Sequence, residues 1–226
     1  NPPVHKARKR FGQNFLHDAS IIQKIVDAIA PQNGDHLVEI GPGQAALTIP
    51  LLQATGVIDA VELDRDLLAV LEEKCAAYGN INLHNADALK FDFAGLKTDE
   101  RQLRLIGNLP YNISTPILFH LLEQRAAIKD MHFMLQKEVV DRMAANPGSK
   151  TYGRLSVMLQ AYCSVEQLFD IGPSAFKPAP KVDSSIVRLV PYANSNINNE
   201  QNFAKIVTCS FAQRRKTLRN NLKRLL

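Results

Sequence analysis

The residues best suited to do chemistry begin with a glycine turn and an acidic residue downstream of it. Residues 41–46, Gly-Pro-Gly-Gln-Ala-Ala, fit the pattern G-x-G-x-x-G/A, and Glu62 stands 21 residues past Gly41. Glycines let the backbone approach a nucleotide closely, and the acidic side chain accepts hydrogen bonds from ribose hydroxyls. The pattern predicts a binding site for a cofactor that contains adenosine.

The glycine turn leaves the identity of that cofactor open. A nicotinamide dinucleotide and S-adenosylmethionine (AdoMet) both carry adenosine, and such a turn can also serve only as a tight strand–helix connection. Pro42 weakens the dinucleotide interpretation, because it removes a backbone N–H that could face a pyrophosphate, a group that AdoMet lacks. Farther along, Asp87 could accept the exocyclic amine of adenine, or it could form a helix cap or an Asx turn.

A second group of candidates is Asn108-Leu109-Pro110-Tyr111. It resembles the Asp/Asn/Ser-Pro-Pro-Tyr/Phe element of methyltransferases that act on amino groups conjugated to a ring or carbonyl. Adenine's exocyclic amine is such a group, and it is a poor nucleophile because its lone pair is delocalised into the ring. The Asn108 side-chain oxygen and the Leu109 carbonyl could accept its two protons and stabilise the charge that develops as the nitrogen attacks a methyl group. Pro110 stiffens the turn, and Tyr111 could stack on a base removed from its helix or loop.

The scaffold expected around these residues is an α/β sheet. Short apolar runs alternate with helical patterns, starting with a helix that Asp18 would cap and Pro31 would stop. The expected strands are 36–40, 57–62, 81–84, 103–107 and 131–136, and the expected helices between them are 45–54, 64–78 and 115–125. This alternation predicts a parallel, doubly wound sheet, whose ligands bind outside the carboxyl ends of the strands.

The pattern changes after residue 136. We expect helices near 137–145 and 153–162, an antiparallel pair of strands at 165–171 and 183–190, and a polar linker at 192–202. The apolar spacing beyond the linker predicts amphipathic helices that carry a basic block. The chain starts at Asn1 and stops on leucines without a capping residue, so we expect pieces to be missing at both ends.

Charge divides the chain into an acidic body with two basic ends. Of its 226 residues, 27 are Lys or Arg and 22 are Asp or Glu, a formal net charge of +5. Residues 1–10 and 203–226 hold eleven of the basic residues and no acidic one, which leaves 16 basic against 22 acidic residues between them. Blocks of like charge are usually solvated tails, but they can also bind polyanions.

Several classes of protein are not expected from the composition. No apolar run has the length of a transmembrane helix, and no secretory signal opens the chain. The three cysteines, Cys75, Cys163 and Cys209, form no CxxC pair, so neither a disulfide scaffold nor a cysteine-based zinc site is expected. The histidines show no paired ligand spacing, and we expect no metal and a reducing, cytoplasmic location.

Longer segments resemble the ribosomal RNA adenine dimethyltransferases, and within that family the branch that acts on the small-subunit (16S) rRNA. The matching segments are 10–16, 38–43, 62–64, 108–116, 135–138, 175–184 and 213–216. The resemblance implies an α/β, Rossmann-like AdoMet-dependent methyltransferase fold: a mostly parallel seven-stranded sheet with an antiparallel hairpin strand. It also implies a small, truncated helical C-terminal domain. We accordingly place the AdoMet-binding catalytic domain at 1–191, and the linker with the start of a helical RNA-binding domain at 192–226.

The resemblance also implies roles for individual residues. Asn14 and Leu16 would lie against the methionine part of AdoMet. Gly41 would lie under the cofactor, Glu62 on its ribose and Asp87 on its adenine, with Asn108 between the cofactor and the target. Phe176 would be a second aromatic wall around the target adenine, and the alternative for it is a packing residue. Two basic blocks would grip RNA phosphates: Arg8, Lys9 and Arg10, and Arg214, Arg215 and Lys216.

The function implied is AdoMet-dependent dimethylation of the 6-amino group of two adjacent adenosines in a 3′-terminal hairpin of 16S rRNA. The expected partner is that rRNA in an immature small ribosomal subunit, with no membrane partner, and the enzyme is expected to act as a monomer. A non-catalytic RNA-binding or ribosome-assembly factor is an alternative that the basic ends support. A nicotinamide oxidoreductase is a third hypothesis, and it rests only on the glycine turn and the spacing to Glu62.

Overall fold

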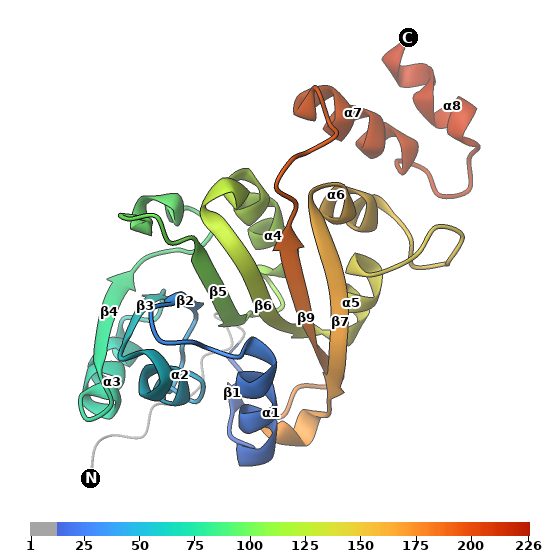
Figure 1. The fold of residues 1–226 in the computed structure, drawn as a ribbon. Coiled ribbons are helices and arrows are strands. Elements are labelled where there is room, and N and C mark those ends of the chain that lie inside the picture. Colours follow the sequence, from blue (N-terminus) through green and yellow to red (C-terminus); the bar gives the residue numbers. More distant parts are fainter. Residues whose placement is uncertain (1–12) are drawn as a thin grey trace.

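A seven-stranded sheet with the strand order β4-β3-β2-β5-β6-β9-β7 organises the chain (Figure 1). The computed structural model describes residues 13–226, so the basic residues Arg8, Lys9 and Arg10 lie outside the described part. The strands are β1 (Phe15–Leu16), β2 (His36–Ile40), β3 (Val57–Glu62), β4 (Asn80–Asn85), β5 (Leu103–Asn108), β6 (Ile128–Gln136), β7 (Cys163–Ile171), β8 (Phe176–Lys177) and β9 (Ser184–Pro191). The α-helices are α1 (Ala19–Ile29), α2 (Thr48–Thr55), α3 (Asp66–Cys75), α4 (Ser114–Glu123), α5 (Lys137–Met143), α6 (Arg154–Tyr162), α7 (Glu200–Ser210) and α8 (Leu218–Leu222).

Strands β2 to β6 run parallel, and β9 lies antiparallel between β6 and β7. This confirms the expected mostly parallel sheet with one reversed hairpin strand. The register places Ile40 beside Gly107, Glu62 beside Asn85, and Asn108 beside Met134. The carboxyl ends of the parallel strands therefore meet at one edge of the sheet.

Helices cover both faces of the sheet, which is why the central strands are apolar on both sides. One face packs against α1, α2 and α3 through residues such as Ile25, Leu51 and Leu71. The other packs against α4, α5 and α6 through residues such as Leu118 and Leu159. None of the helices within residues 13–226 is long and apolar enough to span a bilayer.

Helix α1 begins as expected, because the Asp18 carboxylate accepts hydrogen bonds from the backbone N–H groups of Ser20 and Ile21. Two other helices are shorter than expected. Helix α2 begins at Thr48 and not at residue 45, since Ala45 has a φ of 70° and cannot continue into a right-handed helix. Helix α3 begins at Asp66, whose N–H donates to Asp64 Oδ1, so Asp64 lies in the turn before the helix.

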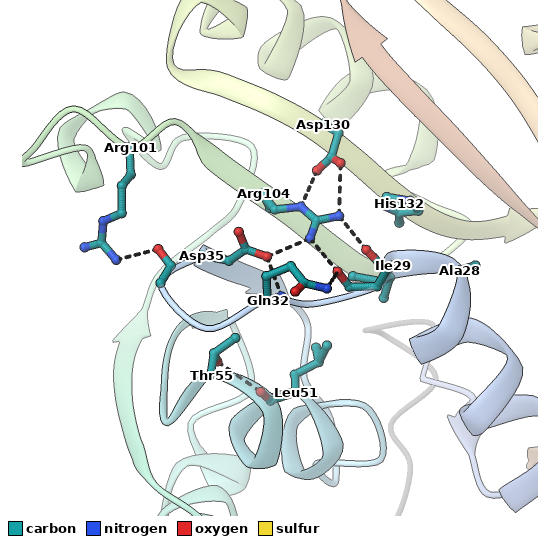
Figure 2. A network of polar contacts seen from close by, with 12 residues as sticks. Ala28, Ile29, Gln32, Asp35, Leu51, Thr55, Arg101, Arg104, Asp130 and His132 are labelled. Atoms are coloured by element: carbon teal, nitrogen blue, oxygen red, sulfur yellow. Dashed lines mark hydrogen bonds and ion pairs between the residues drawn. The ribbon is translucent and has the colours of Figure 1, made fainter.

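At the amino edge of the sheet, Arg104 is the centre of a buried polar network (Figure 2). Its guanidinium donates to both oxygens of Asp130 and to Asp35, at 2.8–3.1 Å, and also to the carbonyl oxygens of Ile29 and Ala30. Arg104 is 7% exposed, so its charge is compensated almost wholly by the protein. The network ties the last turn of α1 to strands β5 and β6.

A second arginine completes this attachment. Arg188 on β9 donates to the Ala28 carbonyl at 2.9 Å and to His132 Nε2 at 3.0 Å. Burial lowers the pKa of His132 to about 4, so the ring is neutral and its Nε2 accepts. The carbonyls of Ala28, Ile29 and Ala30 at the end of α1 thus accept from two arginines, which lie on β5 and β9.

A second sheet was not expected from the sequence. It consists of β1 and β8, which pair antiparallel with Phe15 opposite Lys177 and Leu16 opposite Phe176. The backbone N–H of His17 extends the contact by donating to the Ala175 carbonyl at 3.0 Å. This pairing brings the amino-terminal segment to the proline-rich loop, although more than 150 residues separate them in the chain.

The end of the chain differs in two details from the expectation. The linker is shorter than 192–202, because the Asn199 side chain caps α7 by accepting from the N–H of Asn202. The basic residues 214–216 lie in the turn between α7 and α8 and not on a helix, and Asn221 holds that turn by donating to the Ser210 and Gln213 carbonyls. Val207 of α7 is buried in the core that covers the sheet, and the domain division at residue 191 stays a prediction.

Candidate active site

A cavity opens at the carboxyl edge of the parallel strands, where the sequence predicted a ligand site. It is lined by the turns that follow β2, β3, β4 and β5, by the carboxyl end of β6, and by the segments that contain β1 and β8. The predicted site residues on its wall are Asn14, Leu16, Gly41, Glu62, Asp87, Asn108, Leu109, Pro110, Tyr111 and Phe176. The fold therefore brings together all the predicted cofactor-binding and catalytic residues.

The glycine turn brings the backbone close to this cavity. Gly41 and Gly43 have φ angles of 67° and 59°, in the left-handed region that glycine adopts without strain. A Cβ added to Gly43 would come within 3.0 Å of the Phe15 ring. The turn therefore needs glycine at residue 43 both for its backbone conformation and for the approach of Phe15.

Glu62 is held in one orientation by the backbone around it. Its Oε1 accepts from the N–H of Gly43 at 3.2 Å, and its Oε2 accepts from the N–H of Asp64 at 3.0 Å. Burial raises the pKa of Glu62, while these two N–H groups oppose that shift. Each carboxylate oxygen has a further lone pair, so the group can still accept a hydrogen bond from a ligand hydroxyl.

Glu39 is a site residue that the sequence reasoning missed. It lies on β2, lines the cavity and is buried, and its Oε1 accepts from the Thr48 hydroxyl. Burial raises the pKa of Glu39 to about 7, and the nearby Glu62 adds to the increase. An acidic residue inside an otherwise apolar strand, two residues before the glycine turn, is the signal that could have identified it.

Asp87 forms the Asx turn that its sequence position allowed, and its contact with adenine stays a prediction. Its Oδ1 accepts from the N–H of Leu89 at 3.0 Å, which forms an Asx turn after β4. The residue also lines the cavity. The turn fixes one carboxylate oxygen and leaves the group facing the site where an adenine amine was predicted.

Asn108 lines the cavity at the end of β5. Its Nδ2 donates to the Asn14 carbonyl at 2.9 Å, which orients the side-chain amide and distinguishes its oxygen as the acceptor. The turn that follows is rigid, because Leu109 N–H donates to the Met134 carbonyl, and Ser114 Oγ lies 3.1 Å from the carbonyl oxygens of Pro110 and Tyr111.

The two aromatic candidates differ in their exposure. Tyr111 is 62% exposed at the mouth of the cavity, so its ring has room to contact a ligand face. Phe176 is only 4% exposed and packs with Leu16 and other core residues while it lines the same cavity. Phe176 is therefore a packing residue, and its role as an aromatic wall remains a prediction.

The cavity wall has a distinctive charge. Three carboxylates line it, Glu39, Glu62 and Asp87, and none of the lining residues in the described part of the chain is Lys, Arg or His. Such a wall suits a cation with hydroxyl and amine donors, as in AdoMet, and repels a pyrophosphate. Among residues 13–226, no three His, Cys, Asp or Glu side chains are grouped as a metal site requires.

The predicted RNA-binding residues lie elsewhere. Arg214, Arg215 and Lys216 are exposed and do not line the cavity, and the Arg214 guanidinium donates to the Lys150 carbonyl. The structure thus attaches this basic turn to the loop between α5 and α6. Arg8, Lys9 and Arg10 fall outside the described residues, so their predicted role has no structural account here.

Comparison with known proteins gives a consistent result. The family model of ribosomal RNA adenine dimethylase matches residues 4–226. The chain is 59% identical to the ribosomal RNA small subunit methyltransferase A of Nitrosococcus oceani, over 98% of this chain and 85% of that protein. A dimethyladenosine transferase from Plasmodium falciparum superposes with a TM-score of 0.82 at 31% identity, covering 92% of this chain and 74% of that one. The 23S rRNA methyltransferase ErmE superposes with a TM-score of 0.77 at 27% identity, over 93% and 84% of the two chains.

Proposed function

The chain belongs to the ribosomal RNA adenine dimethylase family, and we propose that its carboxyl-edge cavity holds AdoMet next to a target adenine at Asn108. The protein is an AdoMet-dependent enzyme that dimethylates adenine in small-subunit rRNA. The observation that carries the site assignment is the wall itself, which combines the glycine turn, three acidic side chains and the Asn108 turn, with no basic side chain among its lining residues within 13–226.

The cofactor is held by groups that match its parts. Glu62, fixed by Gly43 and Asp64, accepts from the ribose hydroxyls, and Asp87 accepts from the adenine amine. Asn14 and Leu16 contact the methionine part of AdoMet, and Gly41 lets the backbone pass close beneath the cofactor. When bound, AdoMet supplies an electrophilic methyl group on a positively charged sulfur.

The Asn108 turn holds the nucleophile. The Asn108 oxygen and the Leu109 carbonyl accept the two protons of the adenine 6-amino group, which favours a pyramidal nitrogen and stabilises its developing positive charge. The bond from Asn108 Nδ2 to Asn14 keeps the oxygen oriented for this purpose. Tyr111 stacks on the extruded base, a contact worth about 1–3 kcal/mol, and Phe176 supports the base from the other side.

The finer description of the substrate is also part of the proposal. The enzyme modifies two adjacent adenosines in a 3′-terminal hairpin of 16S rRNA, within an immature small subunit, and it acts as a monomer. Arg214, Arg215 and Lys216 contact RNA phosphates from the exposed turn between α7 and α8. This arrangement separates RNA binding from the cavity that holds the cofactor.

Methyl transfer from tritiated AdoMet tests the proposal directly. Immature small subunits, bare 16S rRNA and large subunits are incubated with the protein, and the RNA is digested and analysed by mass spectrometry for dimethyladenosine. We expect two dimethyladenosines per small subunit and none in the large subunit. Label at another RNA or another base would contradict the substrate assignment, and binding to subunits without transfer would favour the non-catalytic alternative.

A further inference from the structure

The wall of the cavity formed by residues 13–16 is in contact with three other parts of the site. The Asn14 carbonyl accepts from Asn108, and the strand Phe15–Leu16 pairs with β8. The Phe15 ring lies against Gly43 of the glycine turn. Residues 13–16 and their partner segment each contribute only a two-residue strand to the cavity wall, β1 and β8, whereas the walls beside β2, β3 and β5 are the ends of longer strands in the central sheet.

Gln13 provides a fourth attachment. Its Nε2 donates to Asp64 Oδ2 at 2.9 Å, across 51 positions of the sequence. Asp64 is 1% exposed. Its Oδ1 accepts from the Asp66 N–H at 3.1 Å, and its own N–H donates to Glu62 Oε2. One buried carboxylate therefore connects residues 13–16, the start of α3 and Glu62.

We propose that Gln13 and Asp64 form a latch that keeps residues 13–16 closed over AdoMet and sets how long the cofactor stays bound. The inference rests on the proposed placement of AdoMet in the carboxyl-edge cavity. A short two-stranded attachment has lower local stability than the central sheet, so this wall is the part that opens to admit and release the cofactor. Gln13 and Asp64 are positioning residues, since they act on the cofactor through Asn14, Leu16 and Glu62.

The latch predicts a specific change in kinetics for Gln13→Ala. The variant loses a hydrogen bond to a charged group, so AdoMet should dissociate roughly tenfold faster, while its association rate changes little. The measurement preloads the full chain with tritiated AdoMet and chases it with unlabelled AdoMet. In steady-state assays the KM for AdoMet should rise by a larger factor than kcat falls, because Gln13 reaches Asn108 only through the Asn14 carbonyl.

A matched control and a rescue variant separate the latch from a general structural effect. Gln23 also donates to a carboxylate, Asp27 Oδ1 at 2.8 Å, but on the exposed face of α1 away from the cavity, so Gln23→Ala should release AdoMet at the wild-type rate. Gln13→Glu places two carboxylates together and should accelerate release further. Adding Asp64→Asn to Gln13→Glu recreates an amide–carboxylate pair with exchanged roles and should slow release again.

Three outcomes would overturn the proposal. The first is an unchanged dissociation rate in Gln13→Ala, and the second is an equal increase in Gln23→Ala. The third is a failure of Asp64→Asn to slow AdoMet release from Gln13→Glu, which would show that Asp64 acts only as a cap of α3. A wild-type chain that retains no tritiated AdoMet would instead overturn the proposed function, and the latch with it.

Discussion

The two edges of the central sheet use buried polar residues in opposite ways. Strand β5 shows the contrast within four residues, because Arg104 lies at the amino edge and Asn108 at the carboxyl edge. Around Arg104 each carboxylate has a guanidinium partner and the carbonyls at the end of α1 are bound (Figure 2). Around Asn108 the cavity holds three carboxylates and, within the described wall, no basic side chain.

The contrast teaches how to distinguish a structural polar cluster from a functional one. At the amino edge Arg104 and its two carboxylates neutralise one another, so this network stabilises the fold and leaves no charge free to bind a ligand. At the carboxyl edge the acidic side chains accept from backbone N–H groups and a hydroxyl, and the negative charge of the wall has no basic partner among the lining residues of 13–226. That charge is available to a cationic cofactor.

Removing Arg104 should produce the largest effect on stability. Arg104→Ala leaves the half-buried Asp35 and Asp130 without their partner, which should lower the free energy of unfolding by about 3 kcal/mol. Urea denaturation measures the change. The exposed Arg101, which pairs with Asp99, provides the control, and Arg101→Ala should unfold close to the wild type. Equal destabilisation by the two variants would remove the distinction between the buried network and a surface pair.

Asn108→Ala should reduce activity strongly and leave stability almost unchanged. The methyl-transfer rate should fall by about 10²–10³-fold, because one acceptor for the developing charge is lost, while urea denaturation should change little. Asn146→Ala, in the exposed loop between α5 and α6, is the matched control and should keep the wild-type rate. Near-normal transfer by Asn108→Ala would show that the carboxyl edge does not act through this oxygen.

The raised pKa of Glu39 predicts a pH dependence at the carboxyl edge. Burial raises that pKa from 4.5 to about 7, so between these values the folded chain holds a proton that the unfolded chain has lost. Stability should therefore fall as pH rises through this window, by at most about 1.4 kcal/mol per pH unit. Glu39→Gln keeps an acceptor for Thr48 but cannot titrate, so its stability should depend less on pH than that of the wild type. Parallel pH profiles of urea midpoints would contradict the assignment.

The smallest expected effect concerns the separation of RNA binding from the cavity. Replacing Arg214, Arg215 and Lys216 with Ala should make RNA binding less steeply dependent on salt, by up to about 0.7 in the logarithmic slope for each lost phosphate contact. AdoMet affinity should stay constant, since none of the three residues lines the cavity. Filter binding at several salt concentrations measures the slope. An unchanged slope would show that this turn is a solvated surface that does not contact RNA phosphates.

Much of the carboxyl edge could be predicted from local sequence. The glycine turn, Glu62, Asp87 and Asn108 each follow an apolar run, and the ends of parallel strands meet at one edge. The expected strands 36–40 and 57–62 are confirmed to the residue. Helix starts were less predictable, because the left-handed Ala45 and the side chain of Asp64 moved two of them.

Contacts between distant segments could not be predicted in this way. Gln13 meets Asp64 across 51 positions, and Asn108 meets Asn14 across 94. The same holds for the pairing of β1 with β8 and for the partners of Arg104. No periodicity or spacing within a segment specifies such partners, because they depend on how the chain returns to the sheet.

By itself the sequence determined the class of fold and the residue types at the ends of the strands, since apolar periodicity and short polar motifs act over a few residues. Only the tertiary structure decided which of the buried charges are neutralised. It placed Arg104 beside the acids at the amino edge and, among residues 13–226, no arginine in the lining of the cavity at the carboxyl edge. It also decided that residues 13–16 form a wall of the cofactor site, because only folding brings that segment to Asp64, Asn108 and β8.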